Sequence, residues 1–183
     1  MIKLKAAELR TSDPSKEELK KIKRREIYFI LDNILDTYNT GGIFRLADAL
    51  GVKKIYLCGV TETPPNTRIK KASINTTEWV VWEYAETAVE AISKLKKRIP
   101  KVQIIAVEQD KKSLSYTEID YKLPIAFVVG NETDGMSKES LKMCDQIAEI
   151  PMWGVNKSLN VIISLGIVAY HAVGENLDYE ANG

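Results

Sequence analysis

Short, uninterrupted runs of apolar residues constrain the fold of this 183-residue chain more than any other feature. A strand that is apolar along its whole length is buried on both faces, and runs this short do not fit independent helices. The runs, together with one aromatic-rich stretch, predict strands at 27–31, 55–58, 79–82, 102–107, 125–129 and 147–150.

The segments between these runs carry helix signals. Ser15 and Glu18 fit a capping box, which predicts a helix from there to about Arg25. Gly51 occupies the usual glycine position after a helix, and the predicted helices beyond the first are 43–50, 87–98, 137–143 and 158–170. Buried strands that alternate with helices predict an α/β fold, a mostly parallel sheet flanked by helices on both faces.

Length and composition indicate a single-domain protein outside the membrane, but they do not identify what it binds. The length fits one domain, no run approaches the ~18 apolar residues of a membrane helix, and the start lacks a signal-peptide core, so we expect a cytoplasmic protein without membrane contact. Cys58 and Cys144 have no metal-ligand spacing and are expected to be reduced. The net charge is only +1, but basic residues crowd segments 16–25 and 94–101, each of which is either a solvated helix face or a phosphate-binding surface.

The segment Gly130–Gly135 follows a predicted strand and precedes a predicted helix. A plain tight turn would also use Gly, Asn and Asp. Glu132, however, has no evident structural role in such a turn, and a carboxylate at the end of a parallel strand is well placed for a ligand. The glycine spacing matches neither the dinucleotide fingerprint nor a phosphate-binding loop.

A second candidate segment runs from Asn39 to Arg45. Asn39 can cap the following helix, and the glycines Gly41 and Gly42 permit close backbone approach. We place Arg45 in the first turns of that helix, where a cation opposes the helix dipole, and this suggests an anionic partner such as phosphate.

Near the C-terminus, Ser158 and Asn160 could simply cap the last helix. His171, the only histidine, falls late in that apolar helix and is expected to be a packing or surface residue. The sequence therefore offers no Ser-His-Asp arrangement and no cluster of metal ligands, and we expect no metal.

Three segments together resemble the SpoU/TrmH family of RNA ribose 2′-O-methyltransferases, within the SPOUT superfamily. The first match comprises Asp32-Asn33, Asn39, Arg45 and the stretch 47–52. The second comprises 128–132 with Gly135, and the third comprises 150–152 with 158–161. Their order and spacing agree from about Ile27 to Val173.

This resemblance implies a fold, a cofactor and a set of site residues. The C-terminal part would form a trefoil knot, and the domains would be a basic arm or helix 1–25, a methyltransferase domain 26–175 and a short tail 176–183. Members act as homodimers on RNA, here tRNA or rRNA, with S-adenosyl-L-methionine as methyl donor. The implied catalytic residues are Arg45, Asn39, Glu132, Ser158 and Asn160. The implied cofactor-binding residues are Val107, Glu108, Gly130, Asn131, Glu132, Ile150, Met152, Ser158 and Leu159.

The reaction implied is an in-line displacement at the methyl group by a ribose 2′-oxygen, in which positioning supplies much of the rate. A guanidinium with a pKa above about 12 is a poor base. We therefore expect Arg45 to clamp phosphate and stabilise the developing alkoxide. After Asn160 the family commonly has small residues, whereas this chain has Ile162 and Ile163, so the last helix is expected to pack differently.

Three alternatives remain open from the sequence. One is a non-catalytic RNA-binding protein of the same fold, and another is a methyltransferase that acts on a base or a small molecule. A Rossmann-like metabolic enzyme is the third, disfavoured by the missing glycine fingerprint.

Overall fold

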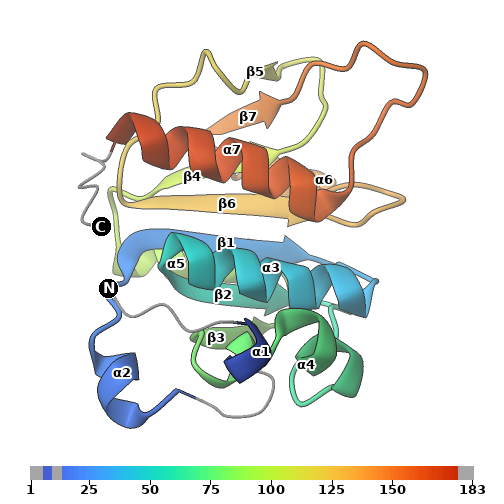
Figure 1. The fold of residues 1–183 in the computed structure, drawn as a ribbon. Coiled ribbons are helices and arrows are strands. Elements are labelled where there is room, and N and C mark those ends of the chain that lie inside the picture. The colour runs from blue at the N-terminus through green and yellow to red at the C-terminus, as the bar shows by residue number, and fades with distance from the viewer. Residues whose placement is uncertain (1–5, 10–13, 177–183) are drawn as a thin grey trace.

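The computed structural model describes residues 6–9 and 14–176, and it contains a seven-stranded sheet of order β3-β2-β1-β6-β4-β7-β5 (Figure 1). All strand pairs in it are parallel. The strands are β1 Arg25–Asp32, β2 Val52–Cys58, β3 Trp82–Ala85, β4 Gln103–Val107, β5 Leu114–Ser115, β6 Ile125–Gly130 and β7 Gln146–Glu149. The predicted α/β fold is confirmed.

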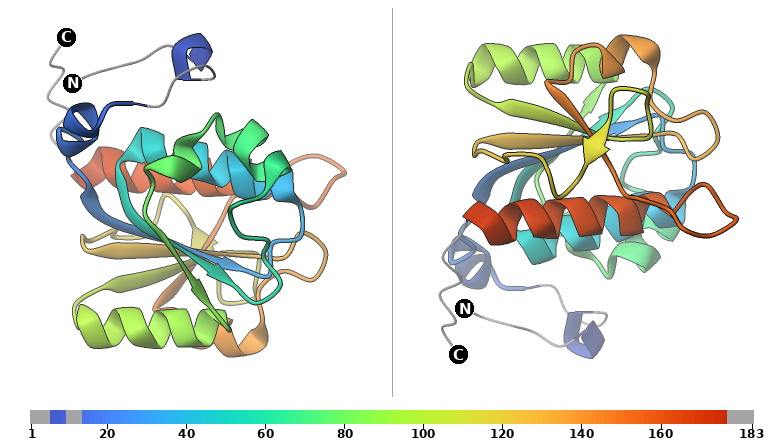
Figure 2. Two further views of the ribbon diagram at one scale, coloured as in Figure 1. Left: turned by 90° about the horizontal axis from the view of Figure 1, so that it is seen from below. Right: turned by 90° about the horizontal axis from the view of Figure 1, so that it is seen from above.

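Helices cover both faces of the sheet (Figure 2). The helices are α1 Ala6–Leu9, α2 Lys16–Lys20, α3 Thr37–Leu50, α4 Thr67–Ser73, α5 Ala88–Arg98, α6 Lys138–Leu141 and α7 Val161–Asn176, with a 3-10 turn η1 at Thr76–Glu78. α3, α4 and α7 lie on one face, and α5 and α6 lie on the other. α3 and α7 are neighbours, and this pairing brings the first and third sequence motifs together.

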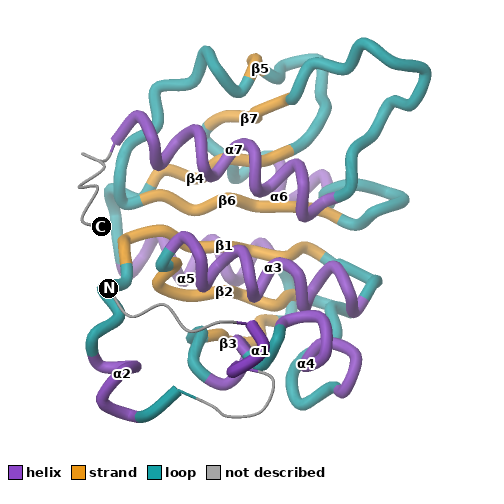
Figure 3. Tube along the Cα trace, viewed as in Figure 1, coloured by secondary structure: helices purple, strands orange, loops and turns teal. Residues whose placement is uncertain are grey.

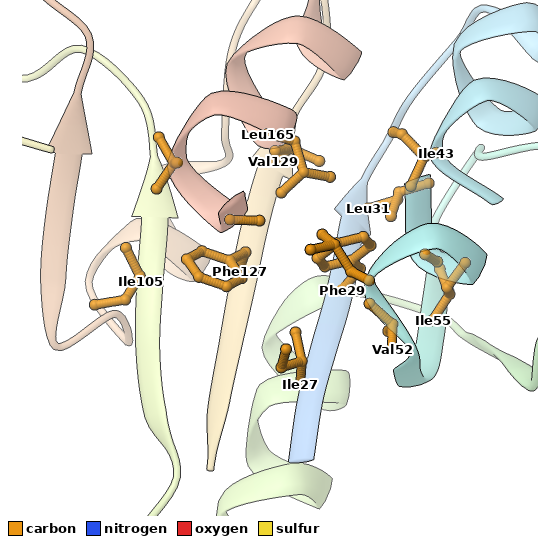
Figure 4. Packing of buried hydrophobic residues seen from close by; sticks show 14 of the residues in the cluster. Ile27, Phe29, Leu31, Ile43, Val52, Ile55, Ile105, Phe127, Val129 and Leu165 are labelled. Carbon is orange, nitrogen blue, oxygen red and sulfur yellow. The ribbon is translucent and has the colours of Figure 1, made fainter. Parts of the chain in front are cut away.

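The central strand β1 explains why the apolar runs are continuous. Ile27, Phe29 and Leu31 pack into the core under α3 and α7 (Figure 4). Tyr28 and Ile30 pack into the core under α5. Successive strand residues point to opposite faces, so a strand between two helical layers needs apolar residues at every position.

The third strand was predicted three residues too early. The stretch 79–82 contains large apolar residues, but Trp79 lies directly after η1, and its indole Nε1 donates to Asp48 Oδ1 at 2.7 Å. The strand begins only at Trp82, which pairs with Ile55. A buried indole nitrogen needs an acceptor, and Trp79 finds it on α3 rather than in the sheet.

Several helix boundaries also differ from the prediction. The Ser15–Glu18 capping box is present, but α2 ends at Lys20 and Arg25 already belongs to β1. α3 begins at Thr37 with Asp36 as its N-cap, so Asn39 is not the cap. α7 begins at Val161, later than expected.

Three short elements were not predicted. They are α4 and η1, which lie between β2 and β3, and the two-residue strand β5 at the sheet edge. Within the described residues, no helix combines the length and apolar character needed to cross a membrane. Residues 1–5 and 10–13 of the expected arm and residues 177–183 of the expected tail lie outside the described residues. The trefoil knot stays a prediction.

Candidate active site

A cavity of about 450 Å³ lies beyond the carboxyl ends of the central strands β6, β4 and β7. The loops that follow β6 and β7 extend past the strand ends on the same side and form its walls (Figure 3). Every residue assigned to the cofactor by the resemblance lines this cavity: Val107, Glu108, Gly130, Asn131, Glu132, Ile150, Met152, Ser158 and Leu159. Ligands of open parallel sheets bind at this edge.

The loop after β6 is closed at its base by its two glycines. Asn131 and Gly135 exchange backbone hydrogen bonds of 3.0 and 2.9 Å. A side chain at Gly130 would collide with the backbone of Met136, and Gly135 has a φ of +70° with Glu108 Oε2 only 2.5 Å from where its Cβ would be. Both positions therefore require glycine, and the tight turn is used to shape the cavity wall.

Three of the predicted catalytic residues form one hydrogen-bonded chain. Asn160 Nδ2 donates to Asn39 Oδ1 at 2.9 Å, and Asn39 Nδ2 donates to Glu132 Oε1 at 2.8 Å. Asn39 is buried, and side chains from the second and third motifs hold both ends of its amide. The remaining oxygen of Asn160 accepts from the backbone N–H of Ile162 and thereby caps α7.

Glu132 has a structural role that the sequence did not show. Its carboxylate accepts from the backbone N–H groups of Leu35 and Asp36 at 3.1 and 3.3 Å, so it ties the β6 loop to the start of α3. Desolvation alone would raise the pKa of this carboxyl, but the hydrogen bonds from Asn39, Leu35 and Asp36 prevail and hold the pKa below its usual range. Glu132 is therefore an ionised acceptor at neutral pH.

A second polar cluster at the end of β1 was missed. Asp32 is 2% exposed, and its Oδ2 accepts from the backbone N–H and the hydroxyl of Ser137 and from the hydroxyl of Ser140, at 3.0, 2.8 and 2.5 Å. Asn33 donates to the other oxygen. The sequence signal was available: a carboxylate directly after an apolar strand. The serines that satisfy it could not be paired with it from sequence alone.

The other two predicted catalytic residues, Arg45 and Ser158, are not part of this hydrogen-bonded chain. Arg45 is exposed on α3, past the first two turns of the helix, so the argument from the helix dipole at its start is wrong. In the described part of the chain, no ion pair or hydrogen bond engages its guanidinium. Ser158 lies on the cavity wall, exposed, and donates to Asn156. Arg45 does not line the cavity.

The paired glycines of α3 serve helix packing rather than ligand contact. A Cβ on Gly41 would lie 2.6 Å from the Cβ of Ala72 and 2.7 Å from the carbonyl oxygen of Ile69, both on α4. A Cβ on Gly42 would collide with the side chain of Ile162 on α7. The bulky Ile162 therefore packs over a glycine, which accommodates the departure from the small residues of the family.

Three basic residues of the two charged segments are engaged within the fold. Arg24 donates to the carbonyl oxygens of Val52 and Trp79, and burial lowers its pKa. On α5, Lys94 pairs with Glu90 and Lys96 pairs with Asp145. By contrast, Arg68 and Lys71 are exposed on α4.

No group of His, Cys, Asp and Glu side chains within the described ranges could hold a metal ion. Burial raises the pKa of the Cys58 and Cys144 thiols to about 12, so neither is a reactive thiolate at neutral pH. The site therefore offers hydrogen-bonding and charged oxygen and nitrogen groups.

Sequence comparison places the chain among known enzymes. It is 33% identical over 156 residues to the tRNA (guanosine(18)-2′-O)-methyltransferase of Aquifex aeolicus, covering 82% of this chain and 70% of that one. The enzyme of the same description from Thermus thermophilus is 29% identical, with 88% and 81% covered. The Escherichia coli enzyme of the same description is 29% identical, and the matched region spans only 60% of its length.

Solved structures agree with the sequence matches. The A. aeolicus TrmH/SpoU tRNA-modifying enzyme superposes with a TM-score of 0.75 at 29% identity, covering 93% of this chain and 83% of that one. An AdoMet-bound rRNA methyltransferase from Sinorhizobium meliloti gives 0.76 at 32% identity, with 86% and 59% covered. The model of the SpoU rRNA Methylase family matches residues 26–170, which contain the cavity and all three motifs. The chain belongs to the SpoU rRNA methylase family.

Proposed function

We propose that this protein transfers a methyl group from S-adenosyl-L-methionine to a ribose 2′-hydroxyl of RNA. The observation that carries the proposal is the chain Glu132–Asn39–Asn160, which joins all three family motifs at the cavity. The relatives described as tRNA (guanosine(18)-2′-O)-methyltransferases support tRNA ahead of rRNA as the substrate.

The cavity suits the proposed cofactor in size and charge. Its volume of about 450 Å³ is within the usual range for small-molecule sites. Glu108, Glu132 and Glu149 line it, and carboxylates favour a ligand that carries a sulfonium and an ammonium group. Gly130, Ile150 and Leu159 also line the cavity and would contact the rest of the ligand. When bound, the cofactor supplies an electrophilic methyl group.

The residues of this chain then position the acceptor. The attacking 2′-oxygen forms the new bond to carbon and its proton is released to solvent, while the bond from the methyl carbon to sulfur breaks and leaves a thioether. Arg45 is exposed on α3 outside the cavity, so it is suited to hold a phosphate of the bound RNA. Asn39, locked by its two partners, keeps the start of α3 in register with the cavity.

We also propose that the protein works as a homodimer. Ile163, Ile167 and Tyr170 form an exposed apolar stripe on α7, next to exposed Tyr38 on α3. Exposed apolar stripes on neighbouring helices favour burial against a partner. A second copy placed there would cover α7, whose first residues Val161 and Ser164 line the cavity.

Nucleoside analysis tests the proposed activity. Bulk tRNA and rRNA from cells lacking the gene are incubated with the purified protein and S-adenosyl-L-methionine, then digested to nucleosides and measured by mass spectrometry. We expect one 2′-O-methylnucleoside to accumulate to a stoichiometric level. A base-methylated product would support the base-directed alternative, and RNA binding without any product would support the non-catalytic one.

A further inference from the structure

A second cavity, of about 380 Å³, lies between Pro64-Pro65, the start of α4, η1 and the first residue of β3. It is separate from the cavity proposed for the cofactor and shares none of its lining residues. We propose that this cavity holds one unpaired nucleobase of the RNA substrate, away from the methylated ribose. The proposal deepens the function proposed above and rests on RNA being the substrate.

The walls of this base pocket are flat and largely apolar. Pro64, Pro65 and Trp82 contribute to the lining, and Trp82 is anchored because it packs against the main core. Unpaired RNA bases bind proteins by stacking on aromatic side chains, and this contact is tolerant of sequence because every base has a π-face. An anchored indole loses little freedom when it binds a base.

The lining of the base pocket also contains polar groups, and cations lie beside it. Lys70 and Glu78, both lining residues, form an exposed ion pair at 3.3 Å, and Arg68 and Lys71 are exposed next to Lys70 on α4. A base carries donors and acceptors on its edge and a phosphate on each side of its sugar. Lys70 can donate hydrogen bonds to the base edge and Glu78 can accept them, while Arg68 and Lys71 can bind the phosphates.

The location of the base pocket is consistent with one continuous RNA path. α4 packs against α3 at Gly41, and Arg45 follows Gly41 by one helical turn on the same side. Asn66 caps α4 by accepting from the N–H groups of Arg68 and Ile69, which fixes the helix beside the pocket. An RNA strand whose ribose lies at the cofactor cavity would thus pass Arg45, then the cations of α4, and then the base pocket.

Cross-linking of the wild-type protein provides the first test. The full chain is irradiated with bulk tRNA, and nucleotide adducts are mapped by mass spectrometry of the digested protein. We expect adducts on the peptides that contain residues 64–70 and Trp82. Adducts confined to other segments would overturn the proposal.

Variants of Trp82 provide the second test, by titration of fluorescently labelled bulk tRNA at several salt concentrations. Trp82→Ala should weaken binding by between about 5-fold and 100-fold, because one stacking contact is lost. Trp82→Phe, which keeps an aromatic face, should stay within about 3-fold of wild type. The slope of log affinity against log salt should be unchanged in both, since stacking releases no counterions.

Charge variants separate stacking from attraction to phosphate. Lys71→Ala should reduce the slope of log affinity against log salt by about one. The matched variant Lys97→Ala, at an exposed position of α5 on the opposite face, should leave this slope unchanged.

Thermal melting and calorimetric titration with S-adenosyl-L-methionine show whether Trp82→Ala is folded. If Trp82→Ala is unfolded, Trp82→Leu, which keeps the apolar core contact without a π-face, takes its place and the same loss of affinity is expected.

The outcomes for the two proposals are distinguishable. If folded Trp82→Ala or Trp82→Leu binds tRNA like wild type while methyl transfer proceeds, only the base pocket is refuted. If wild type transfers no methyl group but tRNA binding depends on the Trp82 ring, the proposed activity fails and the base pocket stands.

Discussion

The side-chain amide of Asn39 is held at both ends, so its orientation is determined by its partners. The Nδ2 group faces the ionised Glu132, and the Oδ1 atom faces the amide of Asn160. The chain therefore has one direction of hydrogen bonding, from Asn160 through Asn39 to Glu132. Because the hydrogen bonds lower the pKa of Glu132 in the folded state, their contribution is present at neutral pH and is lost as the pH falls through that lowered pKa.

The variant Asn39→Asp tests this direction. At neutral pH it would place two carboxylates against each other, and like charges raise one pKa of such a pair. Methyl transfer should fall by about 100-fold at pH 8, an order expected when a positioning contact of a few kcal/mol is lost. Relative to wild type, the activity of the variant should then recover as the pH is lowered, because the introduced carboxyl group, once protonated, can again donate a hydrogen bond to Glu132.

The measurement is the ratio of variant to wild-type kcat/KM from pH 6 to pH 8.5, with Asn39→Ala as control. The alanine variant cannot form the bond in any protonation state, so its ratio should stay flat. A flat ratio for Asn39→Asp as well would show that the chain does not govern the reaction.

The buried Asp32 supports the site from behind. Its Oδ2 atom gathers three donors from Ser137 and Ser140, which lie more than 100 residues further along the chain. Asp32→Asn removes acceptor capacity where donors are already in place, so we expect a loss of about 1–3 kcal/mol in the free energy of unfolding. Urea denaturation measures this loss. Asp134→Asn is the control, because Asp134 is exposed on the loop between β6 and α6 that also contains Ser137, and its free energy of unfolding should not change. Equal losses of free energy in the two variants would contradict the role of Asp32.

The packing of α3 against α4 and α7 fixes the position of the site residues on α3. At Gly41 the nearest atoms belong to the backbone and the Cβ of α4, which cannot move aside. At Gly42 the nearest atom is the far end of the Ile162 side chain. A glycine inside a helix costs about 0.5–1 kcal/mol relative to alanine, so these two positions keep glycine for close contact.

Alanine at each glycine should therefore have different consequences. Gly41→Ala should lower the free energy of unfolding by roughly 2–3 kcal/mol through overpacking. Gly42→Ala should cost less, and the pair Gly42→Ala with Ile162→Val should recover most of the loss. Urea denaturation of the three variants checks the expectation. The absence of any recovery in the double variant would show that Ile162 is not the limiting contact.

Secondary structure was predictable where one local signal dominates. The buried strands followed from continuous apolar runs, and the caps at Ser15, Thr87 and Ser137 are present. The errors fall where a distant contact prevails over the local pattern. Trp79 was assigned to a strand because its acceptor Asp48 is on another element, and Asp36 rather than Asn39 caps α3 because Asn39 is engaged by Glu132 and Asn160.

The candidate site was predictable mainly through resemblance. Motif order identified the residues that line the cavity, because the family pattern already contains the long-range proximity that periodicity lacks. The Asp32–Ser137–Ser140 cluster and the direction of the Asn39 amide were not predictable, since they depend on pairs of side chains about 90 to 120 residues apart. The base pocket lies outside the three motifs, so the resemblance gave no prediction for its residues.

The outer surface of the α3–α7 layer determines how whole molecules associate. Ile163 and Tyr170 are each 52% exposed and Ile167 is 36% exposed, at the spacing of one helix face. Exposure of such a stripe to water is unfavourable, so we expect the purified protein to sediment as a dimer at micromolar concentration.

The double variant Ile163→Glu with Ile167→Glu should sediment as a monomer, because charges at the centre of an interface are strongly disfavoured. Val60→Glu, an equally apolar and exposed site away from α7, serves as the control. Since α7 also borders the cavity through Val161 and Ser164, the monomeric variant should bind tRNA more weakly even though it remains folded. A double variant that remains dimeric would place the subunit contact on another face of the molecule.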